Sequence, residues 1–240
     1  MSEVIEHLEY NRDTNPYPSF GKKFCGERAI ISLTSWKMRI HTVAKTLYSL
    51  YTMCPGFHIV LVLSEEEFPK MCEELPENLM LFVENEMIEL MFVYKNYKSF
   101  KKVLFTMDKY RDVPVISADD DCIYTCNYAQ ELYNAWEKNP NKICSPLVSN
   151  KFGFTWGVGA CSLYPPHIFK VNDNIKLVFS LGTNDDCFYS ALAKKLNISY
   201  KNLNKKWKEW FIFHDDCFAM SKGGYNEKKS LNDFYFNIKL

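Results

Sequence analysis

Short apolar runs alternate with amphipathic segments along the first half of the chain. Helical spacing of apolar residues predicts helices over 41–51, 75–86 and 98–110. Ser64 and Glu67 have capping-box spacing, which predicts a further short helix. The alternation predicts an α/β fold with a mostly parallel, Rossmann-like sheet flanked by helices. The expected strands, short and rich in branched residues, are 29–33, 57–63, 88–93 and 113–118.

The alternation ends near Asp121, and the second half is more irregular. Residues 1–27 are expected to be an irregular lead-in. No linker, repeat or low-complexity segment divides the chain, so residues 1–240 are expected to form one domain, with halves of about 28–121 and 122–240. The elements expected beyond Asp121 are a helix at 129–138, a strand at 143–148, a loop-rich stretch at 150–166 and a helix at 184–196.

Three consecutive acids, Asp119, Asp120 and Asp121, end the fourth predicted strand. In open α/β sheets, ligands bind beyond the carboxyl ends of the strands. Adjacent carboxylates repel one another unless a cation compensates, and hard oxygen ligands suit Mg²⁺ or Mn²⁺. A solvated turn is the alternative, but it accounts for one carboxylate better than for three. The triplet therefore predicts a metal site for a phosphorylated ligand, with Asp119 and Asp121 converging on one face of an extended segment.

Composition excludes several classes of protein. Lysine plus arginine (29) balance aspartate plus glutamate (29), so no basic field would attract nucleic acid. The nine cysteines are scattered without zinc-ligand spacing, which favours reduced thiols and a cytosolic protein. The N-terminus lacks the pattern of a signal peptide, and no apolar run approaches the ~20 residues that cross a bilayer. A soluble protein is expected.

A second acidic pair, Asp185 and Asp186, begins a predicted helix. Thr183 followed by Asp186 is a capping arrangement, and acids suit a helix N-terminus. A helix start can also hold a catalytic carboxylate, and paired carboxylates divide the work in sugar chemistry. Spacing alone leaves both interpretations open.

Two glycines near an aromatic residue are candidate sugar-binding positions. Gly157 and Gly159 would permit close approach of the backbone to a ligand. Trp156 could stack on a sugar ring or fill the core.

Cations and a histidine complete the set of candidates. Arg39 and the pair Lys101–Lys102 follow predicted strands and would reach the rim that carries the acids, where they could neutralise a diphosphate. Ordinary exposed charge is the alternative. His214 could add a metal ligand or form a surface ion pair.

The basic and aromatic run from Lys194 to Phe213 has two functional interpretations, contact with nucleic acid or with an anionic membrane surface. The balanced net charge favours instead a solvated helix face followed by a core strand, with peripheral membrane contact as the second interpretation.

Taken together, these residues resemble the bacterial GT-A glycosyltransferases of polysaccharide and lipooligosaccharide synthesis. The matching pieces keep the order of the family over about residues 29–193. They are Ile31-Ser32-Leu33-Thr34-Ser35 with Arg39-Ile40, Leu63-Ser64-Glu65-Glu66-Glu67-Phe68-Pro69 with Leu75-Pro76, Ser99-Phe100-Lys101-Lys102, Ala118-Asp119-Asp120-Asp121-Cys122-Ile123-Tyr124, Gly157-Val158-Gly159 with Tyr164-Pro165-Pro166, and Asp185-Asp186.

The resemblance implies a hexosyltransferase-like enzyme with a nucleotide-sugar donor, an Asp-x-Asp motif that binds Mn²⁺ or Mg²⁺, and transfer to a hydroxyl of a glycan or lipid-linked acceptor. Residues 28–121 would form the nucleotide-sugar half and residues 122–240 the acceptor half. The implied nucleotide-sugar ligands are Thr34, Ser35, Arg39, Lys102, Asp119 and Asp120; the metal ligands are Asp121 and Asp119, with His214 as an addition.

Either Asp185 or Asp186 would be the acceptor-side carboxylate. If the reaction inverts the anomeric centre, Asp185 is preferred as the base because Asp186 could be only a helix cap; if it retains the anomeric configuration, neither is required in that role. Two rival functions are a nucleotidyltransferase and a non-catalytic nucleotide- or sugar-binding module. The loop after the first strand lacks the glycines expected of a nucleotidyltransferase.

Overall fold

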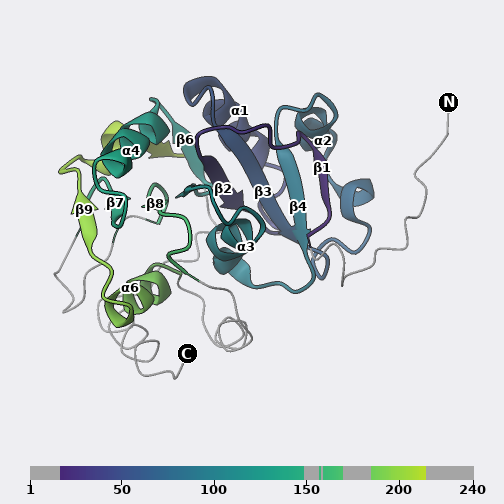
Figure 1. Cartoon of the computed structure of the whole chain (residues 1–240). Helices are drawn as coiled ribbons and strands as arrows, with labels where there is room; N and C mark the ends of the chain where they lie inside the picture. Colours follow the sequence, from purple (N-terminus) through teal and green to yellow (C-terminus); the bar gives the residue numbers. More distant parts are fainter. Residues whose placement is uncertain (1–16, 149–156, 158, 170–184, 215–240) are drawn as a thin grey trace.

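The structure, a computed structural model, describes residues 17–148, 157, 159–169 and 185–214. It is a mixed α/β fold built on an eight-stranded sheet in the order β1-β4-β3-β2-β5-β8-β7-β9 (Figure 1). The sheet strands are β1 (Ser19–Gly21), β2 (Ile30–Thr34), β3 (His58–Ser64), β4 (Glu89–Val93), β5 (Val115–Ser117), β7 (Ile143–Ser145), β8 (Leu163–Tyr164) and β9 (Tyr200–Asn202).

The four central strands β4, β3, β2 and β5 are parallel, as the sequence predicts. The antiparallel strands β1 and β8 flank them, and β7 pairs antiparallel with β8 and parallel with β9. Strands from both predicted halves therefore belong to one sheet.

Alternate residues of each strand face opposite sides of the sheet, and helices cover both sides. In β3, Ile59, Leu61 and Leu63 join the core under α1, α2 and α4, whereas Val60 and Val62 join the core under α3 and α6. Figure 1 shows these two groups of helices on opposite sides of the sheet. The α-helices are α1 (Val43–Met53), α2 (Glu77–Glu84), α3 (Lys101–Lys109), α4 (Tyr128–Glu137) and α6 (Asp185–Lys195).

A two-stranded ribbon lies beside the main sheet. Strand β10 (Phe211–Phe213) pairs antiparallel with β6 (Cys122–Tyr124), so the last described segment returns to the residues that follow the acidic triplet. The short 3₁₀ helices are η1 (Met71–Glu74), η2 (Lys98–Phe100) and η3 (Trp207–Glu209).

Two predictions of local structure are wrong. Residues 19–21 lie in the predicted irregular lead-in but form β1, because the free edge of β4 supplies hydrogen-bond partners that no local pattern reveals. No α-helix starts at Ser64. Its hydroxyl donates to the Glu67 carboxylate at 3.0 Å, and Glu67 also pairs with Lys101 across the sheet end. The two side chains of the predicted capping box therefore bond each other, and Glu67 also pairs with the distant Lys101, instead of capping the backbone N–H groups of a helix.

The remaining predicted elements are confirmed with shifted or shortened ends. The predicted loop-rich stretch at 150–166 contains β8, and residues 150–156 and 158 of this stretch lie outside the described part.

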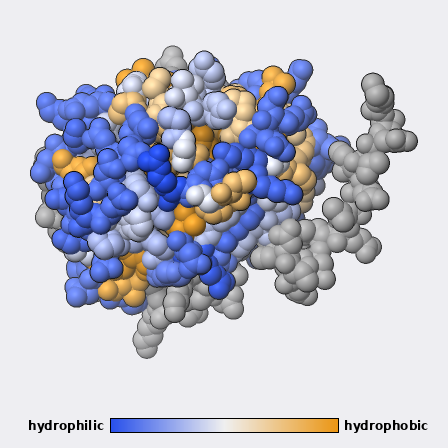
Figure 2. All heavy atoms as spheres, turned by 45° about the horizontal axis from the view of Figure 1, so that its top comes forward, coloured by the Kyte–Doolittle hydropathy of each residue, from blue (hydrophilic) through white to orange (hydrophobic). Residues whose placement is uncertain are grey.

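Seven described cysteines are free, and four of these are buried, which is consistent with the predicted thiols. None of the helices in the described residues has the length and apolar character needed to span a bilayer. The face in Figure 2 is mostly hydrophilic with separate apolar patches.

A buried polar cluster lies at the amino-terminal ends of β3 and β4. The Glu89 carboxylate lies 2.6 Å from His58 Nε2 and 2.6 Å from Lys109 Nζ, and it accepts a hydrogen bond from the Tyr110 hydroxyl. Lys109 Nζ also donates to Ser19 Oγ at 2.7 Å, which ties β1 and α3 to the sheet. Burial acts to raise the pKa of Glu89, but His58, Lys109 and Tyr110 together lower it to about 2.

The lowered pKa of Glu89 predicts an acid-labile fold. A carboxyl group whose pKa is lowered in the folded state adds stability above its ordinary pKa of 4.5, and this is lost as the pH falls towards about 2. We expect the Glu89→Gln variant to be less stable at neutral pH by roughly 3 kcal/mol and to lose less stability on acidification. Urea unfolding at several pH values measures both effects.

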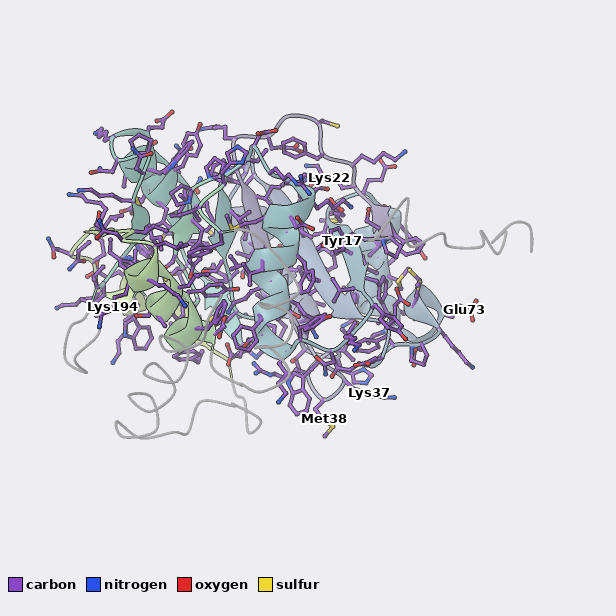
Figure 3. All side chains as sticks on the ribbon, turned by 60° about the horizontal axis from the view of Figure 1, so that its bottom comes forward. Tyr17, Lys22, Lys37, Met38, Glu73 and Lys194 are labelled. Atoms are coloured by element: carbon purple, nitrogen blue, oxygen red, sulfur yellow. The ribbon has the colours of Figure 1, made fainter. Side chains whose placement is uncertain are left out.

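Glu73→Gln is the matched control, because Glu73 projects from the surface (Figure 3). It should follow the pH profile of the unaltered protein. Parallel pH profiles for Glu89→Gln and the unaltered protein would contradict the assignment.

Candidate active site

The candidate site lies where the strand order reverses. From β2 the chain proceeds outward through β3 and β4, and then returns to place β5 on the other side of β2. Such a switch point opens a crevice between the loops at the carboxyl ends of the two neighbouring strands. The loop after β2 carries Ser35 and Arg39, and the loop after β5 carries the acidic triplet. The sheet topology therefore brings together residues that the sequence separates by about eighty positions.

Asp120 is the buried centre of this crevice. Its carboxylate accepts a hydrogen bond from Ser35 Oγ at 2.5 Å and lies 2.8 Å from Arg39 Nη1. The same Arg39 nitrogen lies 3.0 Å from Asp121 Oδ2. Burial raises the pKa of Asp120 to about 6, although Arg39 and Ser35 act to lower it. Arg39 thus compensates two of the three acids at once.

Asp119 faces a different cation. Lys102 Nζ, at the start of α3, lies 2.5 Å from Asp119 Oδ1 and 3.0 Å from Asp185 Oδ2 at the start of α6. Burial acts to lower the pKa of Lys102, but Asp119, Asp185 and Asp186 raise it well above its ordinary value, so the side chain is charged. Lys102 therefore joins the triplet to the second acidic pair.

The expected convergence of Asp119 and Asp121 is wrong. Asp120 and Asp121 share Arg39, whereas Asp119 pairs with Lys102. The physical reason is that β5 ends at Ser117 and the chain turns at Asp120 and Asp121, so the alternation of an extended strand no longer holds.

His214 lies beside the triplet. Because β10 pairs with β6, the His214 backbone N–H donates to the Asp121 carbonyl oxygen at 3.0 Å. Its ring Nε2 lies 3.1 Å from the Asp120 carbonyl oxygen and 3.4 Å from Thr46 Oγ1. The imidazole thus contacts the backbone of the acidic loop, and its role as a metal ligand stays a prediction.

The second acidic pair divides into two environments. Asp185 is 9% exposed and paired with Lys102, whereas Asp186 is less buried and lies against Gly159. A methyl group on Gly159 would come within 1.9 Å of Asp186 Oδ1, so a larger residue would force this carboxylate to shift. Gly157 is crowded instead by the Ser145 and Ser162 hydroxyls.

Trp156 and Thr34 are the two remaining predicted ligands. Trp156 lies outside the described residues. The Thr34 hydroxyl donates to the Val62 carbonyl oxygen at 2.6 Å and so joins β2 to β3.

Sequence reasoning missed two residues that hold the acidic loop. The Tyr124 hydroxyl accepts a hydrogen bond from the Asp119 N–H at 3.0 Å and donates to the Ala160 carbonyl oxygen at 2.8 Å. Thr46 Oγ1 donates to the Asp120 carbonyl oxygen at 2.9 Å. A polar residue on the buried face of α1 is a weak signal for Thr46, and no local signal identifies Tyr124.

The carboxylates of the candidate site could hold a hard cation such as Mg²⁺ only if the phosphates of a bound ligand also coordinated it. Within the described residues, no three histidine, cysteine or acidic side chains form a group that could hold a metal ion. Mg²⁺ is, however, usually bound by one or two carboxylates plus substrate phosphates. Asp121 or Asp119 could supply such a carboxylate, and Arg39 and Lys102, which pair with these acids, are the cations beside them.

Comparison with known proteins shows the fold. No protein-family model matches the chain, and no curated protein is similar to it in sequence. Staphylococcus aureus TarS matches over 87% of this chain with a TM-score of 0.50 and 9% identity. The glycosyltransferase GlyE of Streptococcus pneumoniae TIGR4 matches over 75% with a TM-score of 0.40 and 15% identity. The chain spans 42% of the TarS chain and 46% of the GlyE chain. The chain therefore shares its α/β fold with TarS.

The burial of Arg39 with Asp120 predicts a large loss of stability when the arginine is removed. We expect Arg39→Met to lower the free energy of unfolding by about 3–5 kcal/mol, because Asp120 would remain buried without a cation. Lys37→Met is the control, since Lys37 is exposed at the rim (Figure 3). Urea unfolding measures both variants, and equal losses would contradict the compensating role of Arg39.

Proposed function

We propose that the chain is a GT-A-type glycosyltransferase that moves a hexose-type sugar from a nucleotide-diphosphate donor to a hydroxyl of a glycan or lipid-linked acceptor. The process would be cytoplasmic synthesis of a bacterial surface polysaccharide. The observation that carries the proposal is the pairing of Arg39 and Lys102 with an acidic triplet at the switch point, next to a second acidic pair. The fold shared with TarS is consistent with it.

The donor diphosphate would lie between the two cations. Arg39 and Lys102 supply fixed positive charge where negative charge grows as the sugar–phosphate bond breaks. Asp121 would hold Mn²⁺ or Mg²⁺ together with the donor phosphates, with Asp119 and His214 as further candidate ligands. The metal, when bound with the diphosphate, would supply Lewis-acid stabilisation of the leaving group. Asp120, which accepts a hydrogen bond from Ser35, pairs with Arg39 and would hold it in place.

The acceptor would approach from the side of α6. Its hydroxyl oxygen forms a bond to the anomeric carbon, the bond from that carbon to the phosphate oxygen breaks, and the nucleoside diphosphate leaves with the electron pair. The hydroxyl proton passes to a carboxylate. The greater exposure of Asp186 favours it over the sequence-based preference for Asp185, which is buried and lies 3.0 Å from Lys102 Nζ. Gly157 and Gly159 would border the sugar.

Donor binding is tested by thermal shift with a panel of nucleoside diphosphates, with and without Mn²⁺. A ligand that binds the native state raises the melting temperature, and we expect a rise of a few degrees that depends on metal for one nucleotide. Asp121→Asn should remove the metal-dependent part. Asp112→Asn, at a carboxylate that is 89% exposed, should leave it unchanged. No metal-dependent shift with any nucleotide would contradict the proposal.

The base is tested by a double-mutant cycle. We expect Asp186→Asn to lower turnover about 10²-fold or more. Gly159→Ala should act through the same carboxylate, because its methyl group displaces Asp186. The double variant should therefore be no slower than Asp186→Asn alone.

The assay follows labelled sugar from the identified donor into a glycolipid extract. Release of nucleoside diphosphate distinguishes glycosyl transfer from nucleotidyl transfer, which releases pyrophosphate. Full turnover by Asp186→Asn would exclude Asp186 as the base, and nucleotide binding without any turnover would indicate a binding module.

A further inference from the structure

The last described segment carries a basic–aromatic surface, which we define as Lys206, Trp207, Lys208, Ile212 and Phe213. The Trp207 ring lies 5.4 Å from the Phe213 ring, and Lys208 Nζ lies 5.4 Å from the Trp207 ring. Ile212 and Phe213 are each 56% exposed. Since neighbouring residues of a strand face opposite sides, the end of β10 exposes apolar side chains on both of its faces.

The charge of this surface is local. From Lys201 to His214, both included, the chain has four lysines and a single acid, Glu209. In the whole sequence, by contrast, 29 lysines and arginines balance 29 aspartates and glutamates. Lys205 pairs with Glu131 on α4 at 3.2 Å. Among the described residues, Lys206 and Lys208 make no ion pair with an acid. Lys206 and Lys208 therefore flank Trp207 with positive charge that no acid of the described residues pairs with.

We propose that the basic–aromatic surface binds the anionic surface of a lipid bilayer. Tryptophan and phenylalanine bury their rings at the boundary between headgroups and acyl chains, while lysines reach the phosphates. Nucleic acid would engage the lysines, but it offers no apolar medium for an exposed isoleucine. The contact that we propose lies at the surface of the bilayer.

The surface adjoins the candidate active site. In the β6–β10 ribbon, Phe213 pairs with Cys122, and the next residue, His214, donates its N–H to the Asp121 carbonyl oxygen. A protein bound through Phe213 would therefore hold the acidic triplet close to the bilayer. A lipid-linked acceptor fits this placement, and this last step alone rests on the proposed function.

The test is cosedimentation of the full chain with vesicles of phosphatidylcholine alone or with added phosphatidylglycerol. We expect binding to the anionic vesicles that weakens with salt. Each lysine near an anionic surface changes affinity about fivefold. Lys206→Gln/Lys208→Gln should therefore need roughly tenfold or more additional lipid for half-binding. Ile212→Ser should also weaken binding.

Matched controls come from the other end of the molecule. Lys23→Gln/Lys70→Gln removes the same charge from exposed lysines, and Leu81→Ser replaces an apolar residue that is 52% exposed. Both controls should bind vesicles like the unaltered protein, and circular dichroism confirms that each variant folds.

Three outcomes would overturn the proposal: no binding to anionic vesicles, equal losses in the control variants, or preferential binding of an oligonucleotide in a mobility-shift assay. The readout contains no enzymatic step, so vesicle binding without glycosyl transfer would overturn the proposed function and leave this surface intact.

Discussion

The arrangement of the candidate site depends on one constraint: the three carboxylates after β5 must be compensated by cations. Three adjacent carboxylates cannot be packed at a strand end without cations, because each raises the free energy of ionising its neighbours. Arg39 arrives from the loop after β2 and Lys102 from the start of α3, and both are almost completely buried. Two elements far apart in the sequence are therefore held at the acids by electrostatics. Removing either cation would leave a buried charge unpaired.

The backbone of the acidic loop is held as firmly as its side chains. Tyr124, Thr46 and His214 donate to or accept from its peptide groups, and they come from β6, α1 and the end of β10. A loop supported from three directions needs little reorganisation when an anionic ligand binds, and such preorganisation is the main source of electrostatic catalysis. Lys102 extends the same network to Asp185, so the acidic triplet and the second acidic pair share one cation.

The two ends of the parallel strands use buried charge differently. At the amino-terminal ends, Glu89 is enclosed by His58, Lys109 and Tyr110, and this cluster ties β1 and α3 to the sheet. At the carboxyl ends, the charged groups lie on the loops that follow β2 and β5 and at the starts of α3 and α6. The two ends differ in their expected role because ligands of open α/β sheets bind beyond the carboxyl ends of the strands, where the strand order reverses.

The sequence by itself determined the α/β class, the central strands and the residue types of the crevice, because period-two and helical patterns and a run of acids are local signals. Only the tertiary structure decided which cation meets which acid. In the structure, Arg39 pairs with both Asp120 and Asp121. Lys102 pairs with Asp119 and Asp185, and Asp186 lies against Gly159. The strand β1 and the support from Tyr124 were also invisible to local patterns. In each case the deciding contact joins segments distant in sequence, and their meeting depends on the order of strands in the sheet.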